Sequence, residues 1–185
     1  NINSPTCCGI DWQRSELWLK TDRKVRRGIV VKFKQYLYLR DEAIERLAQG
    51  TTTEEEWDLQ TYAFVGDAVY SVFVRTHLAA TGIAKTRVLH DLAARLVAAK
   101  NQSAVLRTLW DTLTEEERDL CRRARNLSLH APASATLVEY QQSTAWEALL
   151  GYCYRHDQKE RLETLLQTAW PIAQEVMRHE IQSQT

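Results

Sequence analysis

Apolar residues recur three and four positions apart along most of the chain after about residue 33, with polar residues between them. This spacing is typical of amphipathic helices, which turn one face to a core and the other to solvent. It predicts helices over about 33–50, 53–82, 86–111, 114–126, 137–156 and 158–169. Residues 127–136 are predicted to form a loop around Pro132. Pro171 is expected to kink or break the last helical pattern, because proline has no amide N–H to donate.

Helix-start motifs support two of these boundaries. Thr53 stands three residues before Glu56, and Thr114 stands three residues before Glu117. In this spacing the threonine hydroxyl accepts from a backbone N–H, while the glutamate accepts from the N–H of the threonine. Only six glycines and three prolines occur, and no Asn-Gly or Asp-Gly turn is present, so hairpins are disfavoured. The sequence therefore predicts an all-α fold.

The beginning of the chain differs from the remainder because it shows no sustained period. We predict an N-terminal extension over residues 1–30, disordered or outside the native coding sequence, and a single folded domain over 31–185. Since the chain begins without methionine, a native start near Val30 or Val31 is one interpretation. A natural, poorly ordered N-terminal arm is the other.

Composition limits the classes of function. The chain carries 24 Lys and Arg against 24 Asp and Glu, so a nucleic-acid site would need local clustering of basic residues. A glycine-rich phosphate loop is absent. The four cysteines have no CxxC spacing and suggest no disulfide framework, which favours a reducing, cytoplasm-like compartment. Apolar runs are too short for a membrane span, so no membrane partner is expected.

Two acidic residues occur where the pattern predicts burial: Asp67 in TYAFVGDAVY and Glu147 in STAWEALLGY. Burying an ionised carboxylate costs on the order of several kcal/mol unless a partner or a metal compensates its charge. Gly66 precedes the first acid and Gly151 lies one turn after the second, which favours a close approach of two helices. One cation shared by both acids is one interpretation. Pairing of each acid with an arginine or a serine at a helix end is the other.

Three ordered motifs resemble those of a known family. They are FVGDAVY at 64–70, RRARN at 122–126, and the run from Tyr140 through STAWEALLGY at 143–152. Over about residues 57–166 the chain resembles the ribonuclease III family, in particular its short form, Mini-ribonuclease III, which lacks a separate RNA-binding domain. The resemblance implies a ribonuclease III-like all-α domain and a helical homodimer. It also implies magnesium-dependent hydrolysis of double-stranded RNA, with Mn²⁺ as a substitute for Mg²⁺.

Carried onto this sequence, the resemblance makes Asp67 and Glu147 the catalytic, metal-binding acids. Larger members have further acids where this chain has Ala63 and Thr144. More of the coordination of the metal would then fall to water and substrate phosphate, which Mg²⁺ tolerates. Thr144 is expected to position a metal-bound water, and Phe64 is expected at the dimer interface.

An RNA-binding surface is expected between residues 120 and 138, where no acidic residue occurs. Its basic residues are Arg122, Arg123, Arg125 and His130. A-form RNA is recognised mainly through phosphates and 2′-hydroxyls, which such a cluster suits. The alternative is a solvated helix end whose arginines complement the helix dipole. Gln141 and Gln142 stand where the Mini form usually has an arginine and an aromatic residue, so the binding or selection of RNA is expected to differ from the family norm.

The resemblance also implies a cellular role. It predicts maturation of large-subunit ribosomal RNA, with the precursor RNA as substrate and ribosomal proteins or a pre-ribosomal particle as candidate partners. The expected location is a bacterial cytoplasm or a plastid. The alternative function is a catalytically silent relative that binds RNA or ribosomes as a structural protein. The presence of both Asp67 and Glu147 argues against it, because a silent copy has no reason to bury two acids.

Overall fold

The computed structural model describes residues 23–50, 55–127 and 131–183, with side chains described from residue 35 onward. The chain divides into two compact units, one ending at Glu55 and one beginning at Glu56. The helices are α1 (Arg23–Ala48), α2 (Leu59–Ala79), α3 (Thr86–Leu96), α4 (Ala99–Leu109), the 3₁₀ helix η2 (Trp110–Thr112), α5 (Glu115–Arg125), α6 (Leu137–Arg155) and α7 (Lys159–Gln182). Within these described ranges no strand occurs, so the all-α prediction is confirmed.

The first unit contains α1, whose start was predicted ten residues too late. The helix begins at Arg23 rather than near Phe33 and passes through residue 30 without a break. Its large apolar side chains in the described half are mostly exposed, among them Leu39 and Leu47. The proposed division of the chain at residue 30 stays a prediction.

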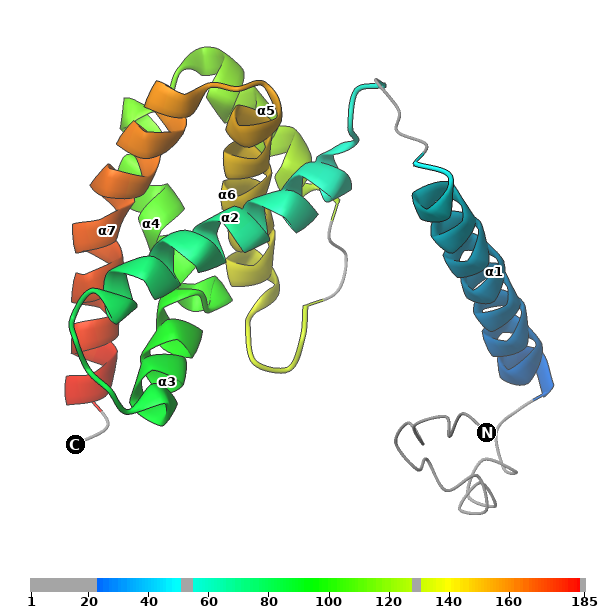
Figure 1. Cartoon of the computed structure of the whole chain (residues 1–185), viewed down its shortest axis with the longest axis horizontal. Helices are drawn as coiled ribbons and strands as arrows, with labels where there is room; N and C mark the ends of the chain where they lie inside the picture. Colours follow the sequence, from blue (N-terminus) through cyan, green and yellow to red (C-terminus); the bar gives the residue numbers. More distant parts are fainter. Residues whose placement is uncertain (1–22, 51–54, 128–130, 184–185) are drawn as a thin grey trace, which may run out of the picture. The chain divides into compact units, whose positions relative to one another are not determined.

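The core of the second unit is built on the crossing of α2 and α6 (Figure 1). A Cβ at Gly66 of α2 would lie 1.8 Å from the carbonyl oxygen of Glu147, and one at Gly151 of α6 would lie 1.9 Å from that of Tyr62. No side chain can occupy such a space, so both glycines are required for the two backbones to touch. The predicted close approach of the two helices is confirmed.

Packing around this crossing buries most of the middle of α6, from Ser143 to Cys153. The indole ring of Trp146 is fully buried and meets Tyr70 of α2 edge to face, with ring centroids 6.1 Å apart. Edge-to-face aromatic pairs contribute about 0.5–1.5 kcal/mol beyond the area they bury. Helices α4, α5 and α7 cover the remaining sides of α6. Glu147 is therefore carried by the well-buried middle of α6.

The helix starts agree only in part with the predicted capping boxes. The box of Thr114 and Glu117 opens α5 and is confirmed. Helix α2 instead begins after Asp58, whose carboxylate accepts from the N–H of Thr61 at 2.7 Å. In the other predicted box, Thr53 lies outside the described residues, and Glu56 precedes the helix and contacts the hydroxyl of Tyr62 rather than capping a threonine.

The stretch 86–111, predicted as one helix, is wrong in that form, because it is two helices, α3 and α4, with η2 after them. The break lies at Val97 and Ala98, and Ala98 has extended backbone angles (φ −62°, ψ 145°). No glycine or proline marks this break in the sequence. A local side-chain hydrogen bond supports it, because the buried side chain of Gln102 donates to the carbonyl oxygen of Val97 at 2.8 Å.

The predicted break at Pro171 is wrong, since α7 continues through the proline to Gln182. The predicted kink stays a prediction. Pro171 is exposed, and so is Gln167, whose carbonyl loses its helical partner to the proline and can be hydrated instead. Ala169 and Ala173 on either side are both fully buried. Burial of the face that continues past the proline offsets the missing hydrogen bond.

Candidate active site

Asp67 and Glu147 line the same cavity of about 450 Å³ in the second unit. Its other lining residues are Gln60, Ala63, Phe64, Leu127, Tyr140 and Thr144. The helix crossing explains the convergence, because Asp67 follows Gly66 and the backbone of Glu147 touches that glycine. Two acids 80 positions apart in the chain are thereby brought to one site, as the sequence predicted.

The two acids differ in burial. Glu147 is half-buried, but Asp67 is exposed, so the expectation that both carboxylates are buried is wrong for Asp67. The reason lies in α2, which is apolar on nearly all faces but is covered on only one side within the described chain. Phe64 and Val72 on its other side are 80% and 66% exposed.

The surroundings of Glu147 disfavour the ionised form of its carboxyl group. The pKa of its carboxyl group is raised to about 7, mainly by burial and also by the negative charge of Asp67, while a hydrogen bond from Gln102 acts in the opposite direction. That bond runs from Gln102 Nε2 to Glu147 Oε1 at 2.9 Å. Near neutral pH Glu147 is therefore protonated in a substantial fraction of molecules, and a bound cation would displace that proton.

Thr144 lies where the sequence placed it, on the wall of the cavity one turn before Glu147. Its hydroxyl donates to the carbonyl oxygen of Tyr140 at 3.0 Å. Because its one proton is used in this bond, the hydroxyl can only accept from a water in the cavity. This direction suits the predicted contact with a water, whose hydrogens point away from a cation. The role itself stays a prediction.

The number of acids at the cavity is small. In the described part of the chain, no group of three or more His, Cys, Asp or Glu side chains is placed to hold a metal ion. Ala63 and Thr144, which stand where larger family members have further acids, both line the cavity. The two positions that lack an acid in this chain therefore lie at the cavity as expected. The carboxylates of Asp67 and Glu147 remain as candidate metal ligands.

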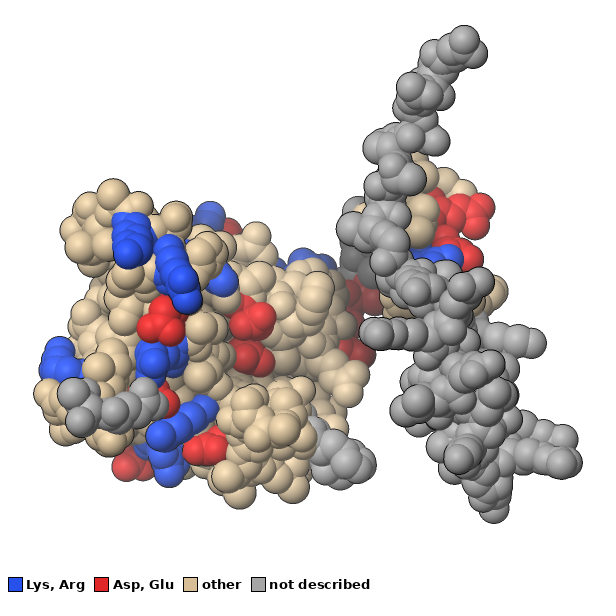
Figure 2. Space-filling model, turned by 90° about the horizontal axis from the view of Figure 1, so that it is seen from below, with Lys and Arg blue, Asp and Glu red and all other residues tan. Residues whose placement is uncertain are grey.

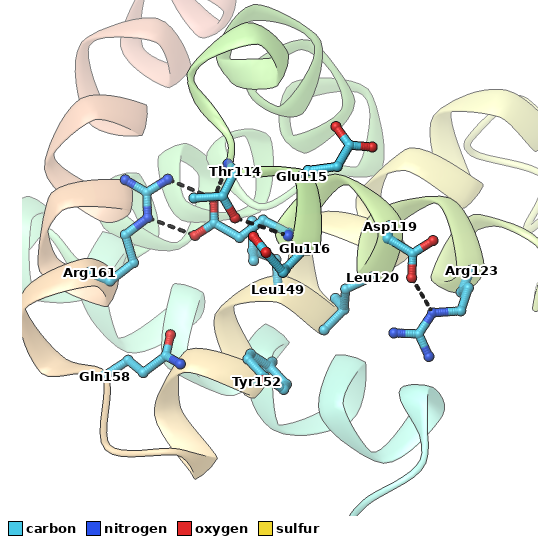
Figure 3. Close-up of a pocket in the computed structure, with 11 residues that line it drawn as sticks. Thr114, Glu115, Glu116, Asp119, Leu120, Arg123, Leu149, Tyr152, Gln158 and Arg161 are labelled. Atoms are coloured by element: carbon cyan, nitrogen blue, oxygen red, sulfur yellow. Dashed lines mark hydrogen bonds and ion pairs between the residues drawn. The ribbon is translucent and has the colours of Figure 1, made fainter.

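The arginines of α5 are more neutralised than the sequence suggested. Arg122 pairs with Glu115 at 2.8 Å, and Arg123 pairs with Asp119 at 3.0 Å (Figure 3). Arg125 lies over the ring of Trp110, 5.7 Å from its centroid. His130 lies outside the described residues. Basic and acidic side chains are mixed on the visible face of the second unit (Figure 2).

A larger cavity, of about 730 Å³, lies between α5, α6 and the start of α7 (Figure 3). Its charged centre is Glu117, which accepts two hydrogen bonds of 2.7 Å from Arg161. Burial raises the pKa of Glu117, but the bonds from Arg161 and the Thr114 N–H outweigh it and leave the pKa below its usual value. This acid is satisfied as a charged group, so Glu117 is not a candidate cation ligand comparable to Glu147.

Two polar groups near the site were missed by the sequence analysis. Gln102 is buried behind Glu147, and its pattern on α4 is that of an ordinary polar residue. Gln142, noted only as a departure from the family, accepts from the buried hydroxyl of Ser103 and so fastens α6 to α4. Neither contact has a local sequence motif that could have revealed it.

Comparison with known proteins assigns this arrangement to a family. The ribonuclease III domain model matches residues 60–158, which include both acids and the two crossing glycines. The chain belongs to the ribonuclease III family. The resemblance inferred from the three motifs is therefore confirmed, and the chain is a ribonuclease III-type endoribonuclease of the Mini form.

Individual relatives agree with the family assignment. Mini-ribonuclease 3 of Brevibacillus brevis is 44% identical over 113 residues, which are 60% of this chain and 84% of that protein. Mini-ribonuclease 3 of Symbiobacterium thermophilum is 47% identical over 110 residues, 59% of this chain and 85% of that protein. A solved crystal structure of a Fusobacterium nucleatum protein is 26% identical with a TM-score of 0.56, covering 63% of this chain and 94% of that one. No helix in the described part of this ribonuclease III family member is long and apolar enough to cross a membrane.

Proposed function

We propose that the chain hydrolyses double-stranded RNA at the cavity of Asp67 and Glu147 with the help of Mg²⁺. The observation that supports this most strongly is the convergence of two carboxylates on one cavity, where burial and their mutual repulsion raise the pKa of Glu147. Mg²⁺ binds oxygen ligands and commonly uses only one or two carboxylates, with water and phosphate as its other ligands. The donor set of this cavity therefore fits Mg²⁺, and Mn²⁺ as its substitute.

The residues around the cavity would have different roles in the reaction. When bound, Mg²⁺ polarises the scissile phosphate, promotes ionisation of a water and stabilises the leaving oxygen. Asp67 and Glu147 would hold the ion, which requires Glu147 to be ionised. The Thr144 hydroxyl can accept a hydrogen bond from the attacking water, because its own proton is donated to the Tyr140 carbonyl oxygen. Gln60, exposed at the cavity mouth, can bind RNA oxygens through its amide.

The working form that we propose is a twofold homodimer. Phe64 lines the cavity and is 80% exposed, next to the acid of α2, and Val72 exposes a further apolar surface on the same helix. Covering a phenylalanine side chain yields about 1.5–3 kcal/mol. A second copy placed over Phe64 would give two active sites across one minor groove, which allows cleavage of both strands. Sedimentation at micromolar concentration should show a dimer, and Phe64→Ser should shift it toward monomer.

The substrate that we propose is structured precursor RNA of the large ribosomal subunit, with ribosomal proteins or a pre-ribosomal particle as partners. The kinship with the Mini form supports this, because the resemblance implies that role. Cleavage of a transcript of the precursor can be compared with cleavage of an unrelated duplex of equal length. Faster, single-position cutting of the precursor is the expected result, and equal rates on both RNAs would contradict the proposed substrate.

The central experiment compares duplex RNA cleavage by the purified chain with and without Mg²⁺. Asp67→Asn should abolish cleavage, while Asp91→Asn, which makes the same chemical change at an exposed acid of α3, should not. RNA binding should persist in both variants. Binding without any cleavage by the unaltered chain in Mg²⁺ would instead favour the silent, structural alternative.

A further inference from the structure

A buried amide lies directly behind the cavity of the two acids. Gln102 of α4 is 1% exposed, and its Nε2 donates to the carbonyl oxygen of Val97 at 2.8 Å and to Glu147 Oε1 at 2.9 Å. A side-chain amide nitrogen carries two hydrogens, so these two bonds use its whole donor capacity. The amide is thus bound at once to the end of α3 and to a candidate metal ligand on α6.

The bond to Val97 sets the direction of the amide. Val97 is the C-cap of α3, and the backbone turns there before α4 begins at Ala99. Because the first N–H is held by this backbone carbonyl and the amide is planar, the second N–H has one direction, which is toward Glu147. The unpredicted break between α3 and α4 therefore has a consequence at the cavity.

Packing alone does not explain an amide at this position. Gln102 Oε1 is buried, and no hydrogen-bond partner for it occurs among the described residues. A buried oxygen without a partner destabilises the folded chain, and an apolar side chain of similar shape would avoid this cost. The retained amide is consistent with a requirement for its N–H group at Glu147.

We infer that Gln102 is a positioning residue that holds the Glu147 carboxylate in the orientation in which it receives the metal ion. Because Gln102 holds Glu147 Oε1, the carboxylate cannot rotate freely about its last side-chain torsion. Binding of the ion therefore costs less side-chain conformational entropy. Hydrogen bonds of this kind behind a metal ligand typically change metal affinity or activity by about 10–100-fold. The inference rests on the proposed metal site of Asp67 and Glu147.

The test replaces Gln102 by methionine, which has nearly the same shape and no N–H donor. The matched control is Asn101→Met, because Asn101 is the neighbouring amide, is 2% exposed, and donates to the carbonyl oxygen of Ala173 on α7 rather than to the cavity. Binding of Mn²⁺ alone is measured by electron paramagnetic resonance, together with melting temperature and the kcat and KM for duplex RNA. Both variants should have a lower melting temperature than the unaltered chain. Only Gln102→Met should bind Mn²⁺ about tenfold or more weakly and lose kcat, with KM for RNA unchanged.

A second comparison separates the positioning role from the site itself. If Gln102 acts through Glu147, adding Gln102→Met to Glu147→Gln should not weaken Mn²⁺ binding any further. Wild-type Mn²⁺ affinity in Gln102→Met, or equal losses in Gln102→Met and Asn101→Met, would overturn the inference. If Glu147→Gln itself binds Mn²⁺ like the unaltered chain, the proposed metal site has failed instead. Should Gln102→Met not fold, Gln102→Asn serves, since it keeps a buried amide that is too short to bridge Val97 and Glu147.

Discussion

Two glutamates of the second unit, Glu117 and Glu147, sit in opposite electrostatic surroundings. Both are at least half-buried, and burial raises the pKa of both. Around Glu117, the guanidinium of Arg161 makes two hydrogen bonds and reverses this shift. Around Glu147, the neighbouring charge is Asp67, which adds to the shift. The charge of Glu117 is neutralised by Arg161 of the same chain, and this pair links α5 to α7. The charge of Glu147 has no such partner among the described residues and can be neutralised by a bound cation.

The comparison also shows why the larger of the two cavities is not the more informative one. The cavity at Glu117 exceeds that of the two acids in volume, about 730 Å³ against about 450 Å³. Glu117 at that cavity is already paired with Arg161, so little binding energy is available at this acid for a cation. The smaller cavity concentrates like charges, and perturbed acids of this kind gather at functional sites.

The largest expected effect comes from removing the crossing that creates the Glu147 site. Gly66→Ala would place a methyl group 1.8 Å from the Glu147 carbonyl oxygen, and Gly151→Ala would do the same to that of Tyr62. Each should destabilise the fold by more than about 4 kcal/mol or prevent folding. Ala68→Ser, an exposed change on α2, is the control. Chemical denaturation measures the difference, and a loss below 1 kcal/mol, as a rough limit, would contradict the geometry.

A smaller effect, on stability alone, is expected at the Glu117 site. Arg161→Met removes both hydrogen bonds and leaves a carboxylate that is 12% exposed without its cation. The expected loss is about 1–3 kcal/mol of unfolding free energy. Cleavage per folded molecule, measured below the melting range, should stay near that of the unaltered chain. A cleavage loss comparable to that of Asp67→Asn would erase the distinction between the two glutamates.

The pH dependence of stability should follow the raised pKa of Glu147. In the folded chain this pKa is about 7, against an ordinary value of 4.5, so the unfolded chain ionises this acid at lower pH than the folded chain does. The contribution of Glu147 to stability is therefore full below about pH 4.5 and is lost as pH rises toward 7. Mg²⁺ should raise the melting temperature more at pH 8 than at pH 5.5, because only the ionised acid binds it. Glu147→Gln should remove most of this difference, and an equal effect of Mg²⁺ at both pH values would contradict the assignment.

The smallest effect is expected from the arginines of α5. Neutralising Arg122, Arg123 and Arg125 together should weaken RNA binding and reduce its dependence on salt. The slope of log K against log salt should change by less than about 3, because Glu115 and Asp119 already pair with two of the three. Filter binding across a salt series measures it. An unchanged slope would leave the cluster as a solvated helix end.

Local sequence determined the features that depend on near neighbours. The capping box of Thr114 and Glu117, the helical periods of α5 and α6, and the loop around Pro132 follow from hydrogen bonds and side-chain spacing within a few residues. The two glycines and the two acids could also be singled out, because each is costly in a helix unless something specific requires it. The motifs then identified the family. The metal-binding role of the acids stays a prediction.

Only the tertiary structure decided the features that depend on residues far apart in the chain. Gln102 donates to Glu147 across 45 positions, and no glycine or proline marks the break between α3 and α4. Pro171 remains inside α7 because buried alanines flank it, and Asp67 is exposed because nothing in the described chain covers its side of α2. The periodicity of a sequence indicates which helix faces are apolar. Which element covers each face depends on packing between residues far apart in the chain, and a local sequence pattern does not specify it.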